Sequence, residues 1–288
     1  MPKTIDQILA KVQDLQPLPR VVTRALEVIR DPRSSAVDVG RVISTDQALT
    51  ARVLKLANSA FYRRARRIST VSEAVVILGF EAVKAQVTAA AAYDLLHKPV
   101  PGYQLAQEEL WRHSLTCAIA SRQLVLGGHG HAPLRGWSSE EAFIAGLLHD
   151  IGKTVLGEYV GAEFQQILEK VHKEGVSFAE AEQQVLGFDH TQVGAMVAEK
   201  WHFPDHLVEA IRFHHRPSQA SRFPQWAALV HIADAVALML GIGLGGDQLL
   251  YPLEAGALEV LGLPVEAVDH LLASMVELTV DLENPLDL

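Results

Sequence analysis

The sequence is poor in cysteine and in aromatic side chains. Its 288 residues include one cysteine, Cys117, which excludes an internal disulfide framework and a zinc site built from several thiolates. Aromatic residues make up 6% of the chain, whereas 49% of it is hydrophobic, with alanine, leucine and valine prominent. This composition favours a globular protein built from helices over one built from sheets.

Positive charge is also scarce. The chain has 25 Lys and Arg against 34 Asp and Glu, which gives a formal net charge of −9. Non-specific binding of nucleic acid requires clustered cations, so this balance of charge argues against it. The most apolar tract, residues 235–246, is too short to cross a bilayer. The first residues lack the apolar core of a signal peptide. We therefore expect a cytoplasmic protein that binds neither nucleic acid nor a membrane.

Helix signals recur along the chain, whereas strand signals are nearly absent. Five segments fit the capping box, in which a hydroxyl and a longer polar side chain satisfy the first N–H groups of a helix; they begin at Thr4, Ser44, Thr70, Ser138 and Ser177. Apolar residues then recur at helical spacing, as in Val22, Ala25, Leu26 and Ile29. No Asn-Gly or Asp-Gly hairpin turn occurs. The sequence predicts an all-α fold.

Proline and glycine mark two weak boundaries. Residues 97–104 follow a long alanine-rich helical pattern, and residues 241–248 are rich in glycine. We therefore expect a front helical region over residues 1–100, a helical core over 101–245, and a helical tail over 246–288 that packs on the same domain.

The middle region holds a series of histidines and aspartates in apolar helical contexts. In chain order they are His113, the pair His149 and Asp150, His190, the pair His214 and His215, then His231 and Asp234. Helical bundles bring such distant positions together by pointing them into a shared core. Imidazole and carboxylate ligands suit iron, manganese, zinc and nickel. His231 lies one helical turn before Asp234, where it is expected to orient a ligand.

The alternative is a metal-free helical scaffold, because a lone histidine on an apolar face is more often a hydrogen-bonded core residue than a ligand. Adjacent helical side chains diverge by roughly 100°. His149 is therefore able to address one metal while Asp150 turns toward a shared position or bridges two. The combined order of these residues favours a buried metal centre.

The segment LLHDIGK at 147–153, followed far downstream by HIAD at 231–234, resembles the HD superfamily of metal-dependent phosphohydrolases. The resemblance implies that His113, His149, Asp150 and Asp234 ligate a metal. His190, His214 and His215 match the further ligands of binuclear members of the HD-GYP type. Lys153 matches a lysine that faces the substrate phosphate in those enzymes.

The front region is similar to the HDOD family, an HD-related output domain of bacterial signalling proteins. The segments that carry this similarity are QPLPRVV at 16–22, STDQALTARVLKLANSAFY at 44–62 and ISTVSEAVVILGFEAVK at 68–84. The resemblance extends from about residue 10 to about residue 280 and implies an HD-type helical bundle with an N-terminal HDOD helical subdomain. Many HDOD domains have lost their HD ligands, whereas this chain keeps a full set. The Gly-Tyr-Pro segment of cyclic di-GMP hydrolases is missing after His215.

Two functions follow from these observations. The first is a signal-transduction or regulatory module with a structural or sensory metal centre and signalling proteins as partners. The second is an active phosphohydrolase that cleaves a nucleotide or cyclic dinucleotide, with Lys153 and Asp150 as its catalytic residues and a phosphate-containing small molecule as its ligand. In both, we expect a divalent, binuclear centre of iron or manganese, with nickel or zinc as alternatives.

Overall fold

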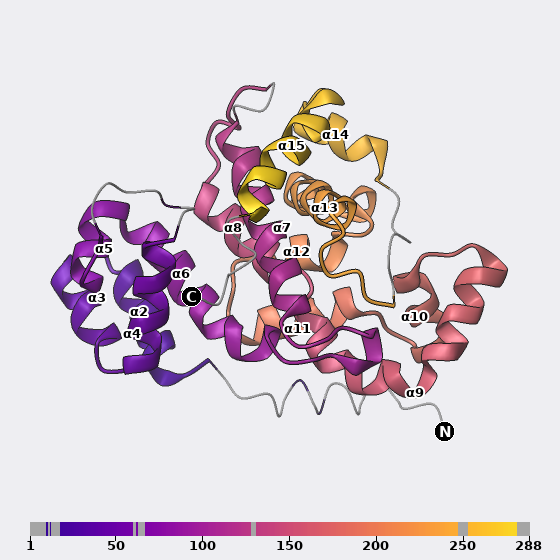
Figure 1. The fold of residues 1–288 in the computed structure, drawn as a ribbon, viewed down its shortest axis with the longest axis horizontal. Coiled ribbons are helices and arrows are strands. Elements are labelled where there is room, and N and C mark those ends of the chain that lie inside the picture. Colours follow the sequence, from indigo (N-terminus) through magenta and orange to yellow (C-terminus); the bar gives the residue numbers. More distant parts are fainter. Residues whose placement is uncertain are drawn as a thin grey trace. The chain divides into compact units, whose positions relative to one another are not determined.

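The computed structural model describes residues 10, 12, 18–59, 62, 67–127, 131–246 and 253–280. Within these residues the regular elements are helices, and the only β-type pairing is an isolated bridge between Val100 and Leu105 (Figure 1). The predicted all-α fold is confirmed. The chain divides into two compact units, one of residues 16–94 with 276–288 and the other of residues 1–15 with 95–275.

The smaller unit is built mainly from five helices. They are α2 (Arg20–Arg30), α3 (Ala36–Ile43), α4 (Gln47–Ala57), α5 (Val71–Leu78) and α6 (Phe80–Leu96), the last of which continues into the larger unit. The apolar stripe of α2 faces a core shared with α3, α4, α5 and α6, and Val22, Ala25, Leu26 and Ile29 are all buried in it. The helical spacing of these four residues thus predicted the buried face of α2.

Side-chain caps start many of the helices, although one predicted capping box is wrong. Thr70, Ser138 and Ser177 each accept a hydrogen bond from the backbone N–H three residues later, as predicted. Ser44, in contrast, ends α3, and Asp46 caps α4 through the N–H of Leu49. Ser44 cannot be the N-cap of α4 because it still forms the C-terminal end of α3. Asp46, two residues later, takes the N-cap position instead. The box predicted at Thr4 lies outside the described residues.

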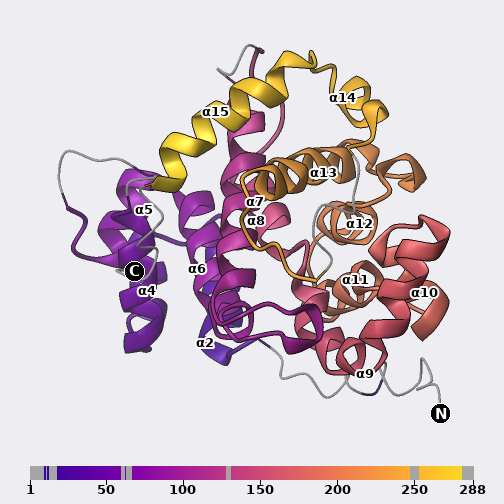
Figure 2. The ribbon, with the colours of Figure 1, turned by 45° about the vertical axis from the view of Figure 1, so that its right-hand side comes forward.

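The larger unit contains the remaining helices, except for the last residues of α15 (Glu266–Val280), which fall in the smaller unit. These helices are α7 (Glu109–Leu126), α8 (Ser139–Leu148), α9 (Ile151–Glu174), α10 (Phe178–Leu186), α11 (His190–Lys200), α12 (Asp205–Phe213), α13 (Pro224–Met239), α14 (Ala255–Leu261) and α15, with 3-10 turns η2 (Pro101–Tyr103) and η3 (Pro217–Gln219). Helix α13 packs against α7, α8, α12 and α14, and α11 packs against α9 and α12 (Figure 2). Residues 227–238 of α13 are all buried, which is typical of a central helix.

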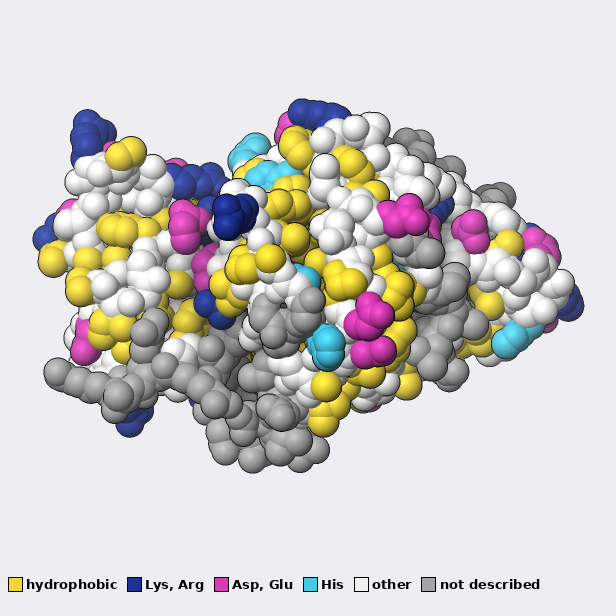
Figure 3. Space-filling view, turned by 90° about the horizontal axis from the view of Figure 1, so that it is seen from above, with side chains coloured by type: hydrophobic (Ala, Val, Ile, Leu, Met, Phe, Trp, Pro, Cys, Tyr) yellow, Lys and Arg dark blue, Asp and Glu magenta, His cyan; other side chains and the backbone are white. Residues whose placement is uncertain are grey.

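The surface of the described residues carries charges of both signs. On the face drawn in Figure 3, Lys and Arg side chains are scattered among acidic ones and form no continuous basic stripe among the atoms shown in colour. No helix within the described part of the chain combines the length and the hydropathy needed to cross a membrane.

Two glycines allow helices to cross at backbone contact around residues 149 and 150. A Cβ on Gly146 would lie 2.6 Å from the carbonyl oxygen of Cys117 in α7, and a Cβ on Gly152 would lie 1.9 Å from the carbonyl oxygen of His190 in α11. Both distances are shorter than any non-bonded carbon–oxygen contact. The absence of side chains at these positions therefore fixes how closely α8 approaches α7 and α9 approaches α11.

We expect Gly152→Ala to lower the free energy of unfolding by about 1–3 kcal/mol, because α9 and α11 must separate to admit the methyl group. Gly256→Ala in α14 is the control, since a Cβ there meets nothing within 4 Å. Thermal melting followed by circular dichroism measures both variants. Equal melting temperatures for Gly152→Ala and the wild type would contradict the close crossing.

Candidate metal centre

The sequence-predicted ligands come from six helices of the larger unit. His113 lies within α7 and Asp234 within α13. The other five stand where helices begin or end: His149 after α8, Asp150 before α9, His190 at the start of α11, and His214 and His215 after α12. All seven are brought together in one buried cluster with two groups of potential ligand atoms.

The first group contains His113, His149 and Asp234. The Nε2 atom of His113 lies 3.3 Å from Nε2 of His149 and 3.1 Å from Oδ1 of Asp234. Nε2 of His149 lies 3.6 Å from the same carboxylate oxygen. Donors about 2.1 Å from one tetrahedral ion are separated by roughly 3.4 Å, so these separations match a single cation.

The second group contains Asp150, His190, His214 and His215. Nε2 of His190 lies 3.0 Å from Nε2 of His215 and 3.5 Å from Oδ1 of Asp150. Nε2 of His214 lies 3.8 Å from the same carboxylate oxygen. This group is also compact enough for one cation.

The carboxylate of Asp150 lies between the two groups. Its Oδ1 faces His190 and His214, whereas its Oδ2 lies 3.6 Å from Nε2 of His113 and 3.5 Å from Nε2 of His149. Asp150 occupies the N-cap position of α9, yet its side chain makes no capping hydrogen bond. Both oxygens therefore point into the cluster.

Burial leaves polar atoms of this cluster without hydrogen bonds. Within the described residues, Oδ1 of Asp150 and Nε2 of His214 have no hydrogen-bond partner, although each is shielded from solvent. An unsatisfied buried polar atom costs about 1–3 kcal/mol. Two such atoms aimed at each other across 3.8 Å fit a cation between them, and a set of imidazole and carboxylate donors without thiolate suits iron, manganese, zinc or nickel.

Hydrogen bonds on the far side of the rings aim three imidazoles inward. Backbone carbonyl oxygens lie near Nδ1 of each: Ile242 at 3.0 Å from His113, Gly146 at 2.7 Å from His149 and Ile211 at 2.8 Å from His214. A neutral ring whose Nδ1–H donates to a carbonyl keeps its lone pair on Nε2. These contacts therefore direct the Nε2 lone pairs into the cluster.

His231 supports the site through the backbone. Its Nδ1 lies 2.7 Å from the carbonyl oxygen of His214, and its Nε2 accepts a hydrogen bond from the backbone N–H of Glu254 at 2.9 Å. The ring thus fixes the chain at His214. Through this backbone contact His231 would orient a ligand residue, which is the role expected from the sequence.

Lys153, in the first turn of α9, forms an ion pair with Asp150 of the cluster. Its Nζ is 2.7 Å from Oδ2 of Asp150, and the side chain is 7% exposed. Burial raises the pKa of the Asp150 carboxyl, but the Lys153 ammonium and the neighbouring imidazoles outweigh it and hold this pKa below its usual range. Burial, reinforced by charge on neighbouring rings, holds the pKa values of His214 and His215 well below the usual range.

Burial lowers the pKa values of His149 and His190 as well, but nearby acidic groups, Cys117 and Asp150 for His149 and Glu182 for His190, outweigh it and hold both above the usual range. A ring must lose its proton to bind a cation.

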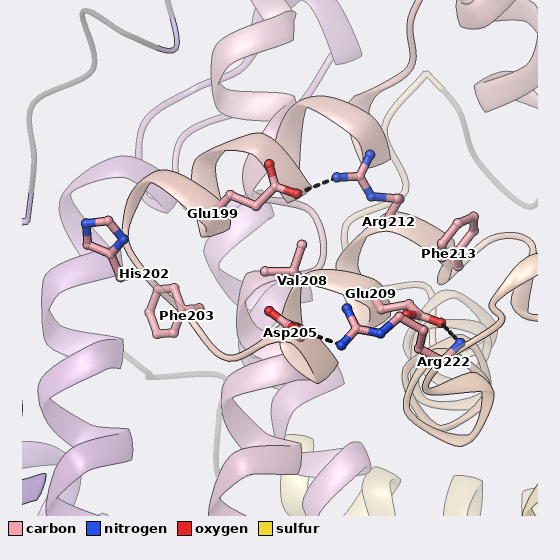
Figure 4. Close-up of a pocket in the computed structure, with 9 residues that line it drawn as sticks. All are labelled: Glu199, His202, Phe203, Asp205, Val208, Glu209, Arg212, Phe213 and Arg222. Atoms are coloured by element: carbon pink, nitrogen blue, oxygen red, sulfur yellow. Dashed lines mark hydrogen bonds and ion pairs between the residues drawn. The ribbon is translucent and has the colours of Figure 1, made fainter.

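A separate pocket of about 470 Å³ opens near the ends of α11 and α12 (Figure 4). None of the seven ligand candidates lines it. Its two arginines are already neutralised, Arg212 by Glu199 at 2.7 Å and Arg222 by Asp205 at 2.9 Å. The carboxylate of Glu209 accepts hydrogen bonds from the backbone N–H groups of Arg222 and Phe223. The arginines and carboxylates of this pocket thus satisfy one another, and we assign it no ligand.

The family model of the HDOD domain matches residues 15–217 of the chain. The chain belongs to the HDOD family. The matched span includes His113, the pair at 149 and 150, His190 and the pair at 214 and 215, and it ends before Asp234.

Solved structures share the fold of this HDOD chain. An HDOD domain protein of unknown function from Geobacter sulfurreducens is 24% identical, with 96% of each chain covered and a TM-score of 0.72, and this likeness shows the fold alone. A candidate phosphohydrolase from Shewanella amazonensis SB2B is 28% identical over 94% of this chain and 93% of that one, with a TM-score of 0.71.

An uncharacterised curated protein from Treponema pallidum (strain Nichols) is 24% identical over 213 residues, or 74% of this chain. The chain covers 40% of the length of that relative.

We expect metal to be lost from the HDOD protein as the pH falls through roughly 6 to 4, because histidines and then carboxylates take up protons that compete with the cation. Metal content after gel filtration at each pH measures the loss, and circular dichroism at the same pH separates it from unfolding. A metal content that does not change while the helices remain folded would contradict ligation by these side chains.

Proposed function

We propose that this HDOD protein is a signal-transduction or regulatory module, of the kind used in bacterial signalling, that carries a His/Asp metal centre. The observation that carries the proposal is the convergence of six donor residues around the buried Asp150 carboxylate within a chain of the HDOD family. Signalling proteins are the partners we propose, and the cytoplasm is the location that we infer from the acidic composition and the buried, unpaired Cys117.

A binuclear centre accounts best for the two groups of donors. One ion would be held by His113, His149 and Asp234, the other by His190, His214 and His215, with one oxygen of Asp150 facing each. The nitrogen and oxygen donors favour iron or manganese, with nickel and zinc as alternatives. In this arrangement the metal would also join six helices and stabilise their packing.

Burial favours a module over an enzyme. Each of the seven side chains is at most 4% exposed, and Lys153 is paired with Asp150, not held open for a substrate. After His214 and His215 the chain continues as Arg216 and the turn η3, without the Gly-Tyr-Pro segment of cyclic di-GMP hydrolases. A closed centre of this kind suits a structural or sensory role.

An active phosphohydrolase is the second candidate, favoured by the complete ligand set and by the likeness to the candidate phosphohydrolase of Shewanella amazonensis. A divalent pair supplies hydroxide near neutral pH and neutralises phosphate oxygens when bound. In this role Asp150 would hold both ions, and Lys153 would turn from Asp150 toward the phosphate and offset its charge. The substrate would be a nucleotide or cyclic dinucleotide.

Metal analysis combined with a substrate screen tests the proposal. The purified protein is supplied with Mn²⁺ or Fe²⁺, its bound metal is measured, and it is incubated with aryl phosphodiesters, nucleotides and cyclic dinucleotides. We expect close to two equivalents of metal and no turnover. His149→Ala and Asp150→Ala should lose at least one equivalent, because they remove donors from the cluster. His172→Ala, an exposed histidine of α9, is the matched control and should keep both.

Turnover that disappears in His149→Ala and Asp150→Ala but not in His172→Ala would establish the phosphohydrolase and contradict the non-catalytic module. A wild-type protein that binds no metal would contradict both candidates and leave a helical scaffold whose histidines fill the core.

A further inference from the structure

We propose that Glu182 and Tyr103 are positioning residues that aim His190 at its metal and strengthen it as a ligand. This inference rests on the proposed metal centre. It goes beyond that centre because neither residue belongs to the ligand set, and no motif in the sequence singles them out. The two groups thereby become chemically unequal, because the group that contains His190 has a carboxylate behind one of its imidazoles, whereas His113 and His149 of the other group have backbone carbonyls behind theirs.

The contacts form a chain of three buried side chains. The hydroxyl of Tyr103 donates a short hydrogen bond to Oε1 of Glu182. The other carboxylate oxygen, Oε2, lies 2.7 Å from Nδ1 of His190 and accepts the backbone N–H of the same residue at 3.1 Å. All three residues are 0% exposed, so solvent does not screen the charge of Glu182.

This carboxylate distinguishes His190 from the other rings with an assigned Nδ1 hydrogen bond. His113, His149 and His214 each place Nδ1 against a neutral backbone carbonyl. A carboxylate that accepts the Nδ1–H of a ligating histidine fixes its tautomer and raises its basicity as a ligand, and removing such a partner typically weakens metal affinity by about 10–100-fold. The group that contains His190 should therefore hold its ion more tightly because of Glu182.

The backbone around Tyr103 is shaped to deliver its hydroxyl to Glu182. Tyr103 ends the turn η2, and Gln104 directly after it has a left-handed backbone with a φ of 56°. Gly102 lies so close to α9 that a Cβ would be 1.9 Å from the carbonyl oxygen of Gly157. The carbonyl oxygen of Tyr103 accepts the N–H of Gly246 at 2.6 Å. The left-handed Gln104 and the close approach of Gly102 to α9 together hold the Tyr103 side chain in the interior.

Tyr103 also lies next to Lys153. The Nζ of Lys153 is 5.5 Å from the centre of the Tyr103 ring, on its face. The same tyrosine thus contacts both the partner of His190 and the lysine that pairs with Asp150. This places Tyr103 where it stabilises two neighbours of the second donor group.

A purely structural role makes a different prediction. Glu182 also joins α10 to the start of α11 through the backbone N–H of His190, so its loss destabilises the protein in either case. Only a positioning role changes the ligand properties of His190 selectively. The test therefore compares Glu182→Gln with Glu180→Gln, a matched carboxylate-to-amide change on α10. Glu180 belongs to the capping box with Ser177 and makes no contact with the cluster among its assigned hydrogen bonds.

Co²⁺ titration monitored by visible absorption, with chelator competition, measures the affinity of each equivalent in the full-length protein. We expect Glu182→Gln to weaken one equivalent by about 10–100-fold and to change its absorption bands, while the other equivalent stays as in the wild type. Glu180→Gln should leave both unchanged. Tyr103→Phe should weaken the same equivalent by a smaller factor, and should have no further effect in the Glu182→Gln background because it acts through Glu182.

Nitrogen NMR of histidine-labelled, metal-free protein is the second measurement. At a pH where the ring is neutral, we expect His190 to carry its proton on Nδ1 in the wild type and to lose this preference in Glu182→Leu, which removes the acceptor of the Nδ1–H; should Glu182→Leu not fold, the Co²⁺ titration of Glu182→Gln carries the test. Unchanged Co²⁺ affinities, equal effects of Glu182→Gln and Glu180→Gln, or an unchanged tautomer would each overturn the inference. A wild-type protein that binds no Co²⁺ but shows the tautomer change would refute the metal centre while upholding the positioning of His190.

Discussion

The buried carboxylate of Asp150 is the constraint on which the rest of the site depends. A charge removed from water is tolerated only when it is paired and hydrogen-bonded. Lys153 compensates Oδ2 of Asp150, but Oδ1 faces His190 and His214 without a hydrogen bond. Four imidazoles lie within 4 Å of this one carboxylate. The proposed metal centre would place a cation beside Oδ1 of Asp150 and supply the compensation that the side chains alone leave unfinished.

The helices meet around Asp150 because their ends, not only their faces, enter the core. Helices α8 and α9 join at His149 and Asp150, α11 begins at His190, and α12 ends before His214. Gly146 and Gly152, on either side of the His-Asp pair, let α8 reach α7 and α9 reach α11 at backbone contact. Gly146 and Gly152 therefore help to bring candidate ligand atoms from distant parts of the chain to within 4.8 Å of one another in each group.

The helices and the residues of the cluster could be predicted from the sequence, whereas the arrangement of the donors and their supporting residues could not. Helix periodicity predicted the core face of α2, and the order of histidines and aspartates predicted the residues of the cluster. The split into two groups around Asp150 depends on distances between helices, which spacing along the chain does not contain.

Glu182 and Tyr103 were missed because a carboxylate in α10 resembles a solvent-facing residue and the turn at Tyr103 depends on a left-handed Gln104. Ser44 was misassigned because two helices adjoin there and Asp46 competes for the cap.

The most direct test of the account is a crystal structure of the protein loaded with Mn²⁺ or Fe²⁺, with anomalous scattering recorded at the absorption edge of the metal. The account predicts two anomalous peaks, one on each side of the Asp150 carboxylate, with histidine nitrogens and carboxylate oxygens about 2.0–2.3 Å from the ions. A map with no peak between His113, His190 and Asp150 would contradict it, and so would metal bound only at the protein surface.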